Sequence, residues 1–208
     1  MTAVTRRRTP GHPADPHRAH EPALAPEPGA AAGPGETAGP HRVGAGTPDD
    51  PAASTAGLFR TAFRRHPAGV AVITVPGLSR PAGFTATSVA SLSLDPPLVS
   101  FGISGTASSW PHLRDSGTAV VHFLAAGQED LARRFATSGI DRFAPPTRFT
   151  TLPGGEPVLD GVATWLLADI DSLVPAGDHH IVICRVTHVQ AGAPHRPLLY
   201  HDGDYHTL

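Results

Sequence analysis

The pattern of hydrophobic and polar residues becomes regular only from about residue 54 onward. Apolar side chains at the spacing of one helical face follow Ser54, and they are Leu58, Phe59, Ala62 and Phe63. Ser54 is a residue type that caps helix N-termini, while Pro67 and Gly69 are residue types that end helices. The sequence therefore predicts a helix that begins after Ser54 and ends before Pro67.

Six later stretches have the composition or the alternation of β-strands. They are residues 70–75, 83–94, 98–104, 118–124, 164–174 and 179–189. In the 98–104 stretch Val99, Phe101 and Ile103 alternate with small residues, which predicts that these three side chains face the core. The 83–94 stretch is rich in Thr and Ser, and we expect an extended segment with one face lined by hydroxyls. Residues 175–178 are turn formers and join the last two stretches into a hairpin.

Two more short helices are expected among these strands. Residues 109–115 carry Pro111 in a first helical turn, and residues 128–138 place Leu131 and Phe135 on one helical face before Gly139. About six or seven strands against three short helices, without a repeating strand and helix unit, indicate a mainly β fold. We therefore expect an antiparallel barrel rather than a doubly wound sheet.

The first quarter of the chain has a different composition. Residues 1–53 contain no Phe, Tyr, Trp or Ile and are rich in Pro, Gly and Ala. Such a segment buries too little apolar surface to offset the entropy lost on ordering. We expect residues 1–53 to be disordered and residues 54–208 to form one folded domain.

Charge and residue usage exclude several classes of function. The net charge of -2 gives no basic surface for binding nucleic acid or an anionic membrane. The sequence also lacks a run of about 18 apolar residues, which a membrane-spanning helix would need. We therefore expect a soluble cytoplasmic protein. All 16 Lys and Arg positions are Arg, which excludes Schiff-base and Walker lysines. Cys184 is the only cysteine, so Cys-rich zinc sites are excluded, and its place within a strand predicts a buried side chain.

Hydroxyl and imidazole side chains are the remaining candidates for chemistry. Ser and Thr hydroxyls are donors of the kind that a phosphate needs, and Arg133, Arg134 and Arg142 could also contact a phosphate. However, a Thr- and Ser-rich strand is also typical of a solvated sheet face, and most surface arginines serve solubility. A metal site is not expected, because His179 and His180 point to opposite faces of a strand and His188 lies about 26 Å from His180. We therefore expect either chemistry performed by a bound cofactor or simple binding.

Five stretches, in the correct order along the chain, resemble the flavin reductase-like family, whose fold is the FMN-binding split barrel. They are FRRHPAGVAVI (63–73), GFTATSVASLSLDPPLVSFGI (83–103), SSWPHL (108–113), GDHHIVICRV (177–186) and PLLYHDGDY (197–205). The resemblance implies an NAD(P)H:flavin oxidoreductase, commonly a homodimer with its flavin at the subunit interface. It also implies FMN or FAD and NADH or NADPH as cofactors.

The resemblance further implies a set of cofactor-binding residues. Those on the flavin side are Thr85, Ala86, Thr87, Ser88, Ser100, Phe101, Gly102, Ser108 and Ser109. Residues 85–88 match the loop that contacts the ribityl chain and phosphate, residues 108–109 match a phosphate-binding serine pair, and residues 100–102 match a strand near the isoalloxazine ring. His179 matches a histidine beside the nicotinamide. No residue is expected to act as a catalytic acid or base, because the hydride passes between cofactors.

The leading hypothesis is a reductase that hands reduced flavin to a partner flavin-dependent monooxygenase. Two alternatives remain open at this point. One is an enzyme that keeps its flavin bound and reacts with O₂ or another acceptor, and the other is a flavin-binding module without catalytic activity.

Overall fold

The computed structural model describes residues 54–77 and 79–208, so the disorder predicted for residues 1–53 lies outside the described residues. The helices of the described part are α1 (Thr55–Arg64), α2 (Trp110–Arg114) and α3 (Glu129–Ala136). Its strands are β1 (Ala68–Gly69), β2 (Ala71–Val75), β3 (Ala82–Ala86), β4 (Ala90–Leu94), β5 (Pro97–Ser104), β6 (Thr118–Phe123), β7 (Phe149–Thr151), β8 (Pro157–Leu159), β9 (Thr164–Ala176), β10 (His179–Gln190), β11 (Leu198–His201) and β12 (Asp204–Thr207). The expected mainly β fold with three helices is present.

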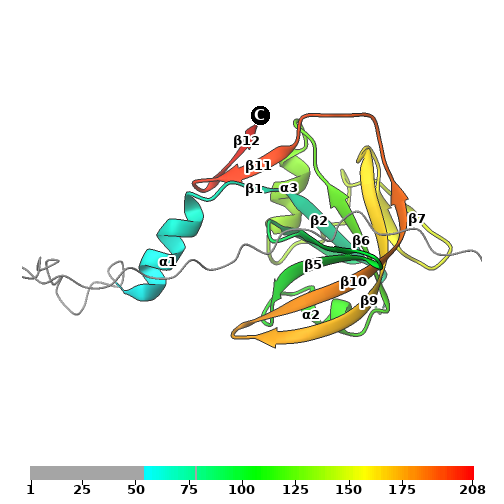
Figure 1. Ribbon diagram of the computed structural model, residues 1–208. Coiled ribbons are helices and arrows are strands. Elements are labelled where there is room, and N and C mark those ends of the chain that lie inside the picture. Colours follow the sequence, from blue (N-terminus) through cyan, green and yellow to red (C-terminus); the bar gives the residue numbers. More distant parts are fainter. Residues whose placement is uncertain (1–53, 78) are drawn as a thin grey trace, which may run out of the picture. The chain divides into compact units, whose positions relative to one another are not determined.

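Seven strands form one antiparallel sheet in the order β3, β2, β6, β9, β10, β5, β4 (Figure 1). Strands β3 and β4 are therefore the two edges of the sheet, yet only residues 87–89 join Ala86 to Ala90. An extended chain advances at most about 3.6 Å per residue, so these edges lie within about 14 Å of each other. The sheet consequently curls into a barrel that stays open between β3 and β4.

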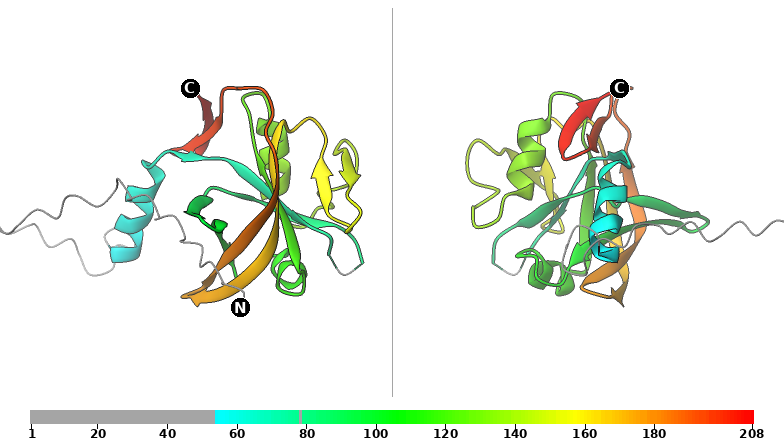
Figure 2. Two further views of the ribbon diagram at one scale, coloured as in Figure 1. Left: turned by 45° about the vertical axis from the view of Figure 1, so that its right-hand side comes forward. Right: turned by 90° about the vertical axis from the view of Figure 1, so that its left-hand side faces the viewer.

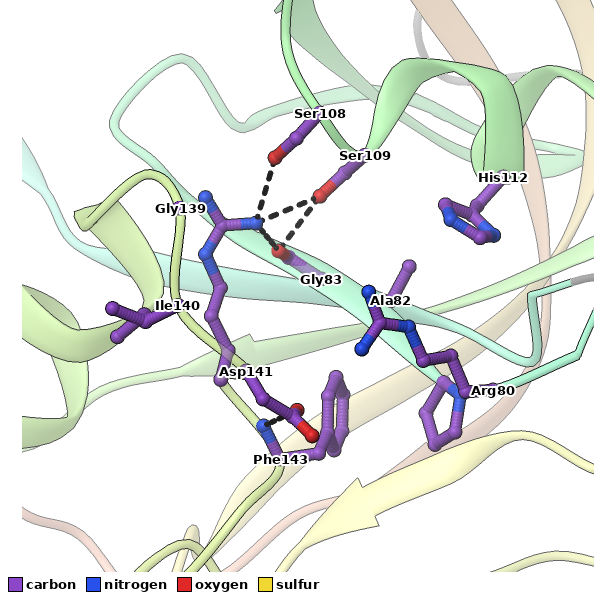
Figure 3. Close-up of a pocket in the computed structure, with 12 residues that line it drawn as sticks. Arg80, Ala82, Gly83, Ser108, Ser109, His112, Gly139, Ile140, Asp141 and Phe143 are labelled. Carbon is purple, nitrogen blue, oxygen red and sulfur yellow. Dashed lines mark hydrogen bonds between the residues drawn. The ribbon is translucent and has the colours of Figure 1, made fainter.

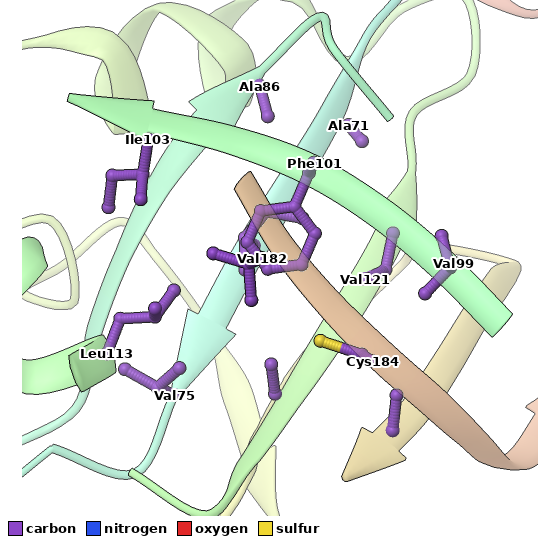
Figure 4. Packing of buried hydrophobic residues seen from close by; sticks show 13 residues of the cluster. Ala71, Val75, Ala86, Val99, Phe101, Ile103, Leu113, Val121, Val182 and Cys184 are labelled. Atoms are coloured by element: carbon purple, nitrogen blue, oxygen red, sulfur yellow. The ribbon is translucent and has the colours of Figure 1, made fainter. Parts of the chain in front are cut away.

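The interior of the barrel holds the main core (Figure 4). Val99, Phe101 and Ile103 of β5 point into it and are each at most 3% exposed, which confirms the alternation predicted for this strand. Cys184 is fully buried in the same cluster, as its mid-strand position predicts. The core thus fixes β5 and leaves the alternate residues of that strand, including Gly102, on the other face.

A second core lies between the outside of the barrel and α3. Every residue of β2 is buried, because Ile73 faces the interior while Val72 packs in the cluster that contains Phe135 of α3. This two-sided burial explains why residues 70–75 are a continuous apolar run rather than an alternating one. Two smaller sheets, β1–β11–β12 and β7–β8, accompany the barrel, and the sequence pattern did not predict them.

Helix α1 forms where the sequence predicts it, and the Ser54 side chain accepts a hydrogen bond from the Gly57 amide at 3.1 Å. No residue of α1 is buried, and Leu58, Phe59 and Phe63 of its apolar face are 60–62% exposed. Figures 1 and 2 show α1 standing apart from the seven-stranded sheet. The apolar face of α1 is therefore not covered by the described part of the chain.

The single extended segment predicted for residues 83–94 is not formed. The chain leaves the sheet after Ala86 and re-enters it at Ala90 on the opposite edge, so the Thr and Ser side chains do not share one face. Thr85 shows the consequence, because its hydroxyl donates a hydrogen bond to the carbonyl of Ala132 in α3 at 2.6 Å. Alternation with a period of two shows which residues share a strand face, but it does not show where the chain passes from one sheet edge to the other.

The predicted hairpin is confirmed, with β9 and β10 paired along their length and interrupted by two register shifts. Its turn contains Gly177, whose φ of 65° lies in the left-handed region that glycine adopts without steric cost. The turn brings His179, the first residue of β10, opposite Ser104 at the end of β5. This pairing positions His179 at the same end of the barrel as the loop that leads into α2.

Candidate functional site

A cavity of about 470 Å³, here called the central pocket, lies at the open side of the barrel. Of the ten cofactor-binding residues predicted from the sequence, those that line it are Thr85, Ala86, Thr87, Ser88, Gly102, Ser108, Ser109 and His179. They come from the end of β3, from the chain crossing that follows it, from β5, from the loop before α2 and from the start of β10. The fold thus brings together residues that are separated by almost one hundred positions in the sequence.

Ser100 and Phe101 do not line the central pocket. The Phe101 side chain is 1% exposed and belongs to the barrel core, so only its main chain is available to a ligand. Ser100 lies on β5 between Ala90 of β4 and Ile183 of β10 and is half-buried. The predicted contact of this strand with a flavin ring therefore depends on Gly102.

Gly102 and Ser88 lie in direct contact across the barrel opening. The Gly102 amide donates a hydrogen bond to the Ser88 hydroxyl at 2.9 Å, which ties the edge crossing to β5. A Cβ atom at position 102 would lie 3.4 Å from the Ser88 oxygen, so the Ser88 side chain lies beside the position that a larger residue would fill. Gly102 and Ser88 therefore form this part of the pocket wall together.

The best-defined polar cluster of the pocket joins Ser108 and Ser109 to Arg142 (Figure 3). One terminal nitrogen of Arg142 donates hydrogen bonds to the Ser108 hydroxyl at 3.2 Å, the Ser109 hydroxyl at 3.1 Å and the Gly83 carbonyl at 2.9 Å. The Arg142 Nε donates to the Thr137 carbonyl at 3.0 Å. Ser109 is 2% exposed and its hydroxyl also donates to the Gly83 carbonyl at 2.8 Å. These bonds hold the guanidinium against the serine pair.

Arg142 carries an unneutralised positive charge in this cluster. Among the described residues no carboxylate lies within ion-pair distance of it, whereas Arg64, Arg114, Arg133, Arg148 and Arg185 each have one. Partial burial lowers the pKa of the Arg142 guanidinium, because removal from water penalises its charged form. A guanidinium stays protonated in proteins, so this site is stabilised by an anion.

The sequence offered Arg142 only as one of several arginines that could contact a phosphate, with nothing to prefer it over Arg133 and Arg134. Arg142 stands 33 positions after Ser109, outside any of the elements that carry the serine pair, and arginines on helix flanks usually serve solubility. Only the folded chain places it beside Ser108 and Ser109. Conversely, Ser109 precedes α2 but makes no side-chain bond to cap it, since its hydroxyl is engaged by Gly83 and Arg142.

His179 lies at the rim of the central pocket with its side chain 52% exposed. Its Nδ1 forms a hydrogen bond with the Asp178 carboxylate at 2.7 Å. This hydrogen bond, reinforced by the charge of His179 when protonated, lowers the pKa of Asp178. A charged Asp178 therefore orients the imidazole, whose Nε2 edge remains available to a ligand.

A larger and open cavity of about 1070 Å³, here called the helix groove, continues from the central pocket. The two cavities share Thr87, Ser88 and His179, and the groove is completed by Phe59 and Phe63 of α1. A ligand bound in the central pocket thus extends from the Arg142 cluster toward a wide, partly apolar space beside His179.

Among residues 54–77 and 79–208, no group of three or more His, Cys, Asp or Glu side chains is arranged to hold a metal ion. Within the same residues, no helix is long and apolar enough to cross a membrane.

Comparisons with known proteins identify the family. The model of the family described as "Flavin reductase like domain" matches residues 63–208. An NADH:FMN oxidoreductase of Rhodococcus qingshengii is 46% identical over 166 residues, which cover 78% of this chain and 86% of that protein. HsaB of Rhodococcus jostii, the reductase subunit of a flavin-dependent monooxygenase, is 35% identical over 147 residues, which cover 71% of this chain and 75% of that subunit.

Solved structures agree with this assignment. The flavin reductase domain protein of Arthrobacter sp. FB24 has a TM-score of 0.70 and 40% identity, and the match covers 74% of this chain and 95% of that one. The Streptomyces globisporus NADH:FAD oxidoreductase SgcE6, in complex with NAD and FAD fragments, has a TM-score of 0.69 and 32% identity, covering 74% and 93%. The chain belongs to the flavin reductase-like family. The predicted fold class, the NAD(P)H:flavin oxidoreductase activity and the use of flavin and nicotinamide nucleotides are thereby confirmed.

Proposed function

We propose that this enzyme reduces FMN or FAD with NADH or NADPH at the central pocket and releases the reduced flavin to a partner monooxygenase. The observation that carries the proposal is the Arg142 cluster, an unneutralised guanidinium beside two serine hydroxyls at one end of the pocket. A flavin phosphate is a dianion and needs several donors. The second terminal nitrogen of Arg142 has no acceptor among the described residues, so it is available to such a phosphate.

In this arrangement Ser108, Ser109 and Arg142 would hold the phosphate of the flavin. The ribityl chain then passes residues 85–88, where the Thr87 and Ser88 side chains are exposed to the pocket. Gly102, which lines the pocket on β5 and has no side chain, would face the ring. In these assignments, hydroxyl and guanidinium groups contact the polar parts of the flavin, and the residue without a side chain faces its ring.

The helix groove, which is the open continuation of the pocket at His179, would admit the nicotinamide. Bound together, the two cofactors supply the hydride donor and the hydride acceptor. The residues of the chain contribute orientation, since placing two reactants in contact lowers the entropic cost of reaction and no acid or base is required for the hydride itself. His179, held by Asp178, orients the nicotinamide rather than exchanging a proton with it.

A monooxygenase as the recipient of the reduced flavin is supported by the relationship to HsaB, whose name identifies it as the reductase subunit of such an enzyme. An open site also supports release, because the central pocket continues into the helix groove instead of closing over its ligand.

We also propose a homodimer, which is supported by two exposed apolar surfaces on one chain. Phe59 and Phe63 of α1 are about three-fifths exposed, and the hairpin exposes the cross-strand pair Val174 and Ile181. In a two-fold dimer, each helix would cover the apolar sheet surface of the other subunit. A second copy of this chain is therefore the proposed occupant of the α1 face.

The dimer has its own test in solution. Changing Phe59 and Phe63 together to Ser removes the apolar face of α1. We expect sedimentation velocity to show a monomer, and we expect this monomer to bind flavin more weakly. The matched control is Val189→Ser, because Val189 is an apolar residue that is 54% exposed and does not belong to α1. A dimer that survives the double substitution contradicts this arrangement.

The activity is tested by oxidation of NADH and of NADPH, followed at their absorbance, with FMN, FAD, riboflavin or no flavin added. Turnover that rises with free flavin is the expected result. A tightly held flavin that supports turnover without added flavin indicates instead an enzyme that reacts directly with O₂ or another acceptor. No oxidation with any flavin leaves only a binding module and contradicts the proposal.

A further inference from the structure

A second cavity, here called the side pocket, adjoins the central pocket and has a volume of about 320 Å³. The two cavities share Ser108, Ser109 and Arg142, so the Arg142 cluster forms a wall between them. A phosphate bound at this wall can carry a substituent on either side. The proposed placement of the ribityl chain uses only the central pocket and leaves the side pocket without a function.

The side pocket has an excess of positive charge. Arg80 lines it together with Arg142, and among the described residues neither guanidinium has a carboxylate within ion-pair distance. Asp141 is the only acidic residue of the lining, and its carboxylate already accepts a hydrogen bond from the Phe143 amide at 3.0 Å. Figure 3 shows the Arg80 side chain and the His112 ring at the same pocket. This lining favours an anionic ligand.

The rest of the lining is apolar and aromatic. The ring of Phe143 is held edge to face by Phe135 and Phe149, with centroid distances of 5.3 and 5.1 Å, and it also borders the pocket. Ile140, which is 45% exposed, lies on the same lining. Flat apolar surface next to unpaired guanidinium groups is the combination that a purine nucleotide requires.

We propose that the side pocket binds the adenylate half of FAD, with Arg80 contacting the second phosphate while Arg142 contacts the first. This inference rests on the proposed function, because it requires the first flavin phosphate to lie at the shared wall. It assigns to Arg80 the role of a specificity residue: Arg142 recognises both FMN and FAD, whereas Arg80 recognises only the dinucleotide.

The nicotinamide nucleotide is not the expected ligand of the side pocket. Its reactive ring must approach the flavin near His179, which lines the helix groove. The helix groove and the side pocket have no lining residue in common, and the Arg142 cluster lies at the end of the central pocket that borders the side pocket. A flavin dinucleotide, in contrast, spans the shared wall through its pyrophosphate.

The test compares the dissociation constants of FMN and FAD, measured by flavin fluorescence on the full chain. Arg80→Ala should weaken FAD roughly tenfold, as expected for the loss of one charge-assisted hydrogen bond, and should leave FMN within about twofold. Ile140→Asp, which places a negative charge at the same pocket, should also weaken FAD selectively. Arg148→Ala removes a guanidinium that is 86% exposed and lines neither pocket, and it serves as the control.

Equal effects of Arg80→Ala on FMN and FAD, or no effect on either, overturn the assignment of the side pocket. A raised KM for NADH with unchanged FAD binding also overturns it, because the pocket would then serve the nicotinamide nucleotide. In each of these cases, continued NADH oxidation with FMN shows that the proposed function itself holds.

Discussion

The imidazole ring of His180 lies flat against the indole ring of Trp110, with ring centroids 3.9 Å apart and planes inclined by 18°. Trp110 is the first residue of α2 and follows Ser109, while His180 follows His179 at the start of β10. The stack therefore joins the loop that holds Ser108 and Ser109, the proposed phosphate contacts, to the turn that holds His179. Neither ring lines the central pocket, so the stack can affect a ligand only by positioning the residues beside it, Ser109 and His179.

Replacing His180 with Ala should loosen this junction and raise the KM for FMN several-fold, with a loss of about 1–3 kcal/mol in unfolding free energy from the lost packing. His180→Phe is the matched variant. It keeps the stack and removes the His180 Nδ1, which is buried and has no hydrogen-bond partner among the described residues. We expect the Phe variant to bind flavin normally and to melt at the same or a higher temperature. Equal loss of flavin affinity in both variants would contradict a positioning role for the stack.

A buried histidine makes the stability of the barrel depend on pH. His122 is fully buried, its Nδ1 lies 3.1 Å from the Val72 carbonyl, and its Nε2 accepts a hydrogen bond from the Leu159 amide at 3.0 Å. This arrangement fits the neutral ring with its proton on Nδ1. Burial lowers the pKa of His122 from 6.5 to about 4, so the unfolded chain binds a proton more readily than the folded one.

The stabilisation from neutral His122 is complete above pH 6.5 and is lost as the pH falls from 6.5 toward 4. We expect up to about 3 kcal/mol of unfolding free energy to disappear over this interval. Urea unfolding of the parent and of His122→Asn at several pH values measures the effect. The Asn variant keeps a side-chain donor for Val72 but cannot take up the proton, so its stability should fall less steeply. Identical slopes would show that His122 is not the titrating group.

The fold was largely predictable from the sequence, because its elements depend on local patterns. The apolar alternation of residues 98–104 and the turn formers between residues 174 and 179 correctly placed β5 and the β9–β10 hairpin. The crossing at residues 87–89 was missed, since the residues on both sides of it have the same composition and nothing local marks a change of sheet edge. Short strands such as β7 and β8 carry too few residues to show any period.

The site was predictable in part. Most of the residues implied by the family resemblance line one pocket, because the resemblance carries positional information that composition lacks. The sequence named Arg142 as a possible phosphate contact but did not place it beside Ser108 and Ser109, and it did not reveal the stack of His180 on Trp110. Both depend on contacts between segments far apart in the chain. The sequence shows that Arg142 exists but not that its charge lacks a carboxylate partner in the described fold.

Cys184 should be unreactive in the folded protein. Its side chain is fully buried, and desolvation, reinforced by the negative charges of Asp171 and Asp169, raises the pKa of its thiol to about 12. We expect no labelling by iodoacetamide at about pH 8 in the native state and complete labelling in denaturant, because the thiolate is the reactive form. Cys184→Ala should retain flavin reduction and lose roughly 1 kcal/mol of stability from the small cavity created. Rapid native labelling with loss of activity would contradict the structural role.

His179→Ala should raise the KM for NADH with little change in the dissociation constant of FMN, because the ring lies at the rim of the pocket and beside the helix groove. Asp178→Asn keeps a hydrogen-bond acceptor for the imidazole while removing the charge, and we expect a smaller effect from it. Steady-state kinetics with NADH varied at saturating FMN, together with fluorescence titration of FMN, separates the two steps. An equal loss of NADH use and FMN affinity would place His179 on the flavin instead.

The proposed function depends most directly on the Arg142 guanidinium as the partner of the flavin phosphate. The decisive measurement compares the dissociation constants of FMN and riboflavin, which differ only in the phosphate, for the parent protein and for Arg142→Ala. We expect FMN to weaken roughly 10- to 100-fold, as for a lost hydrogen bond between charged groups, and riboflavin to change by less than about twofold. If FMN and riboflavin weaken equally, or if FMN is unaffected, the phosphate does not lie at Arg142 and the proposed orientation of the flavin is wrong.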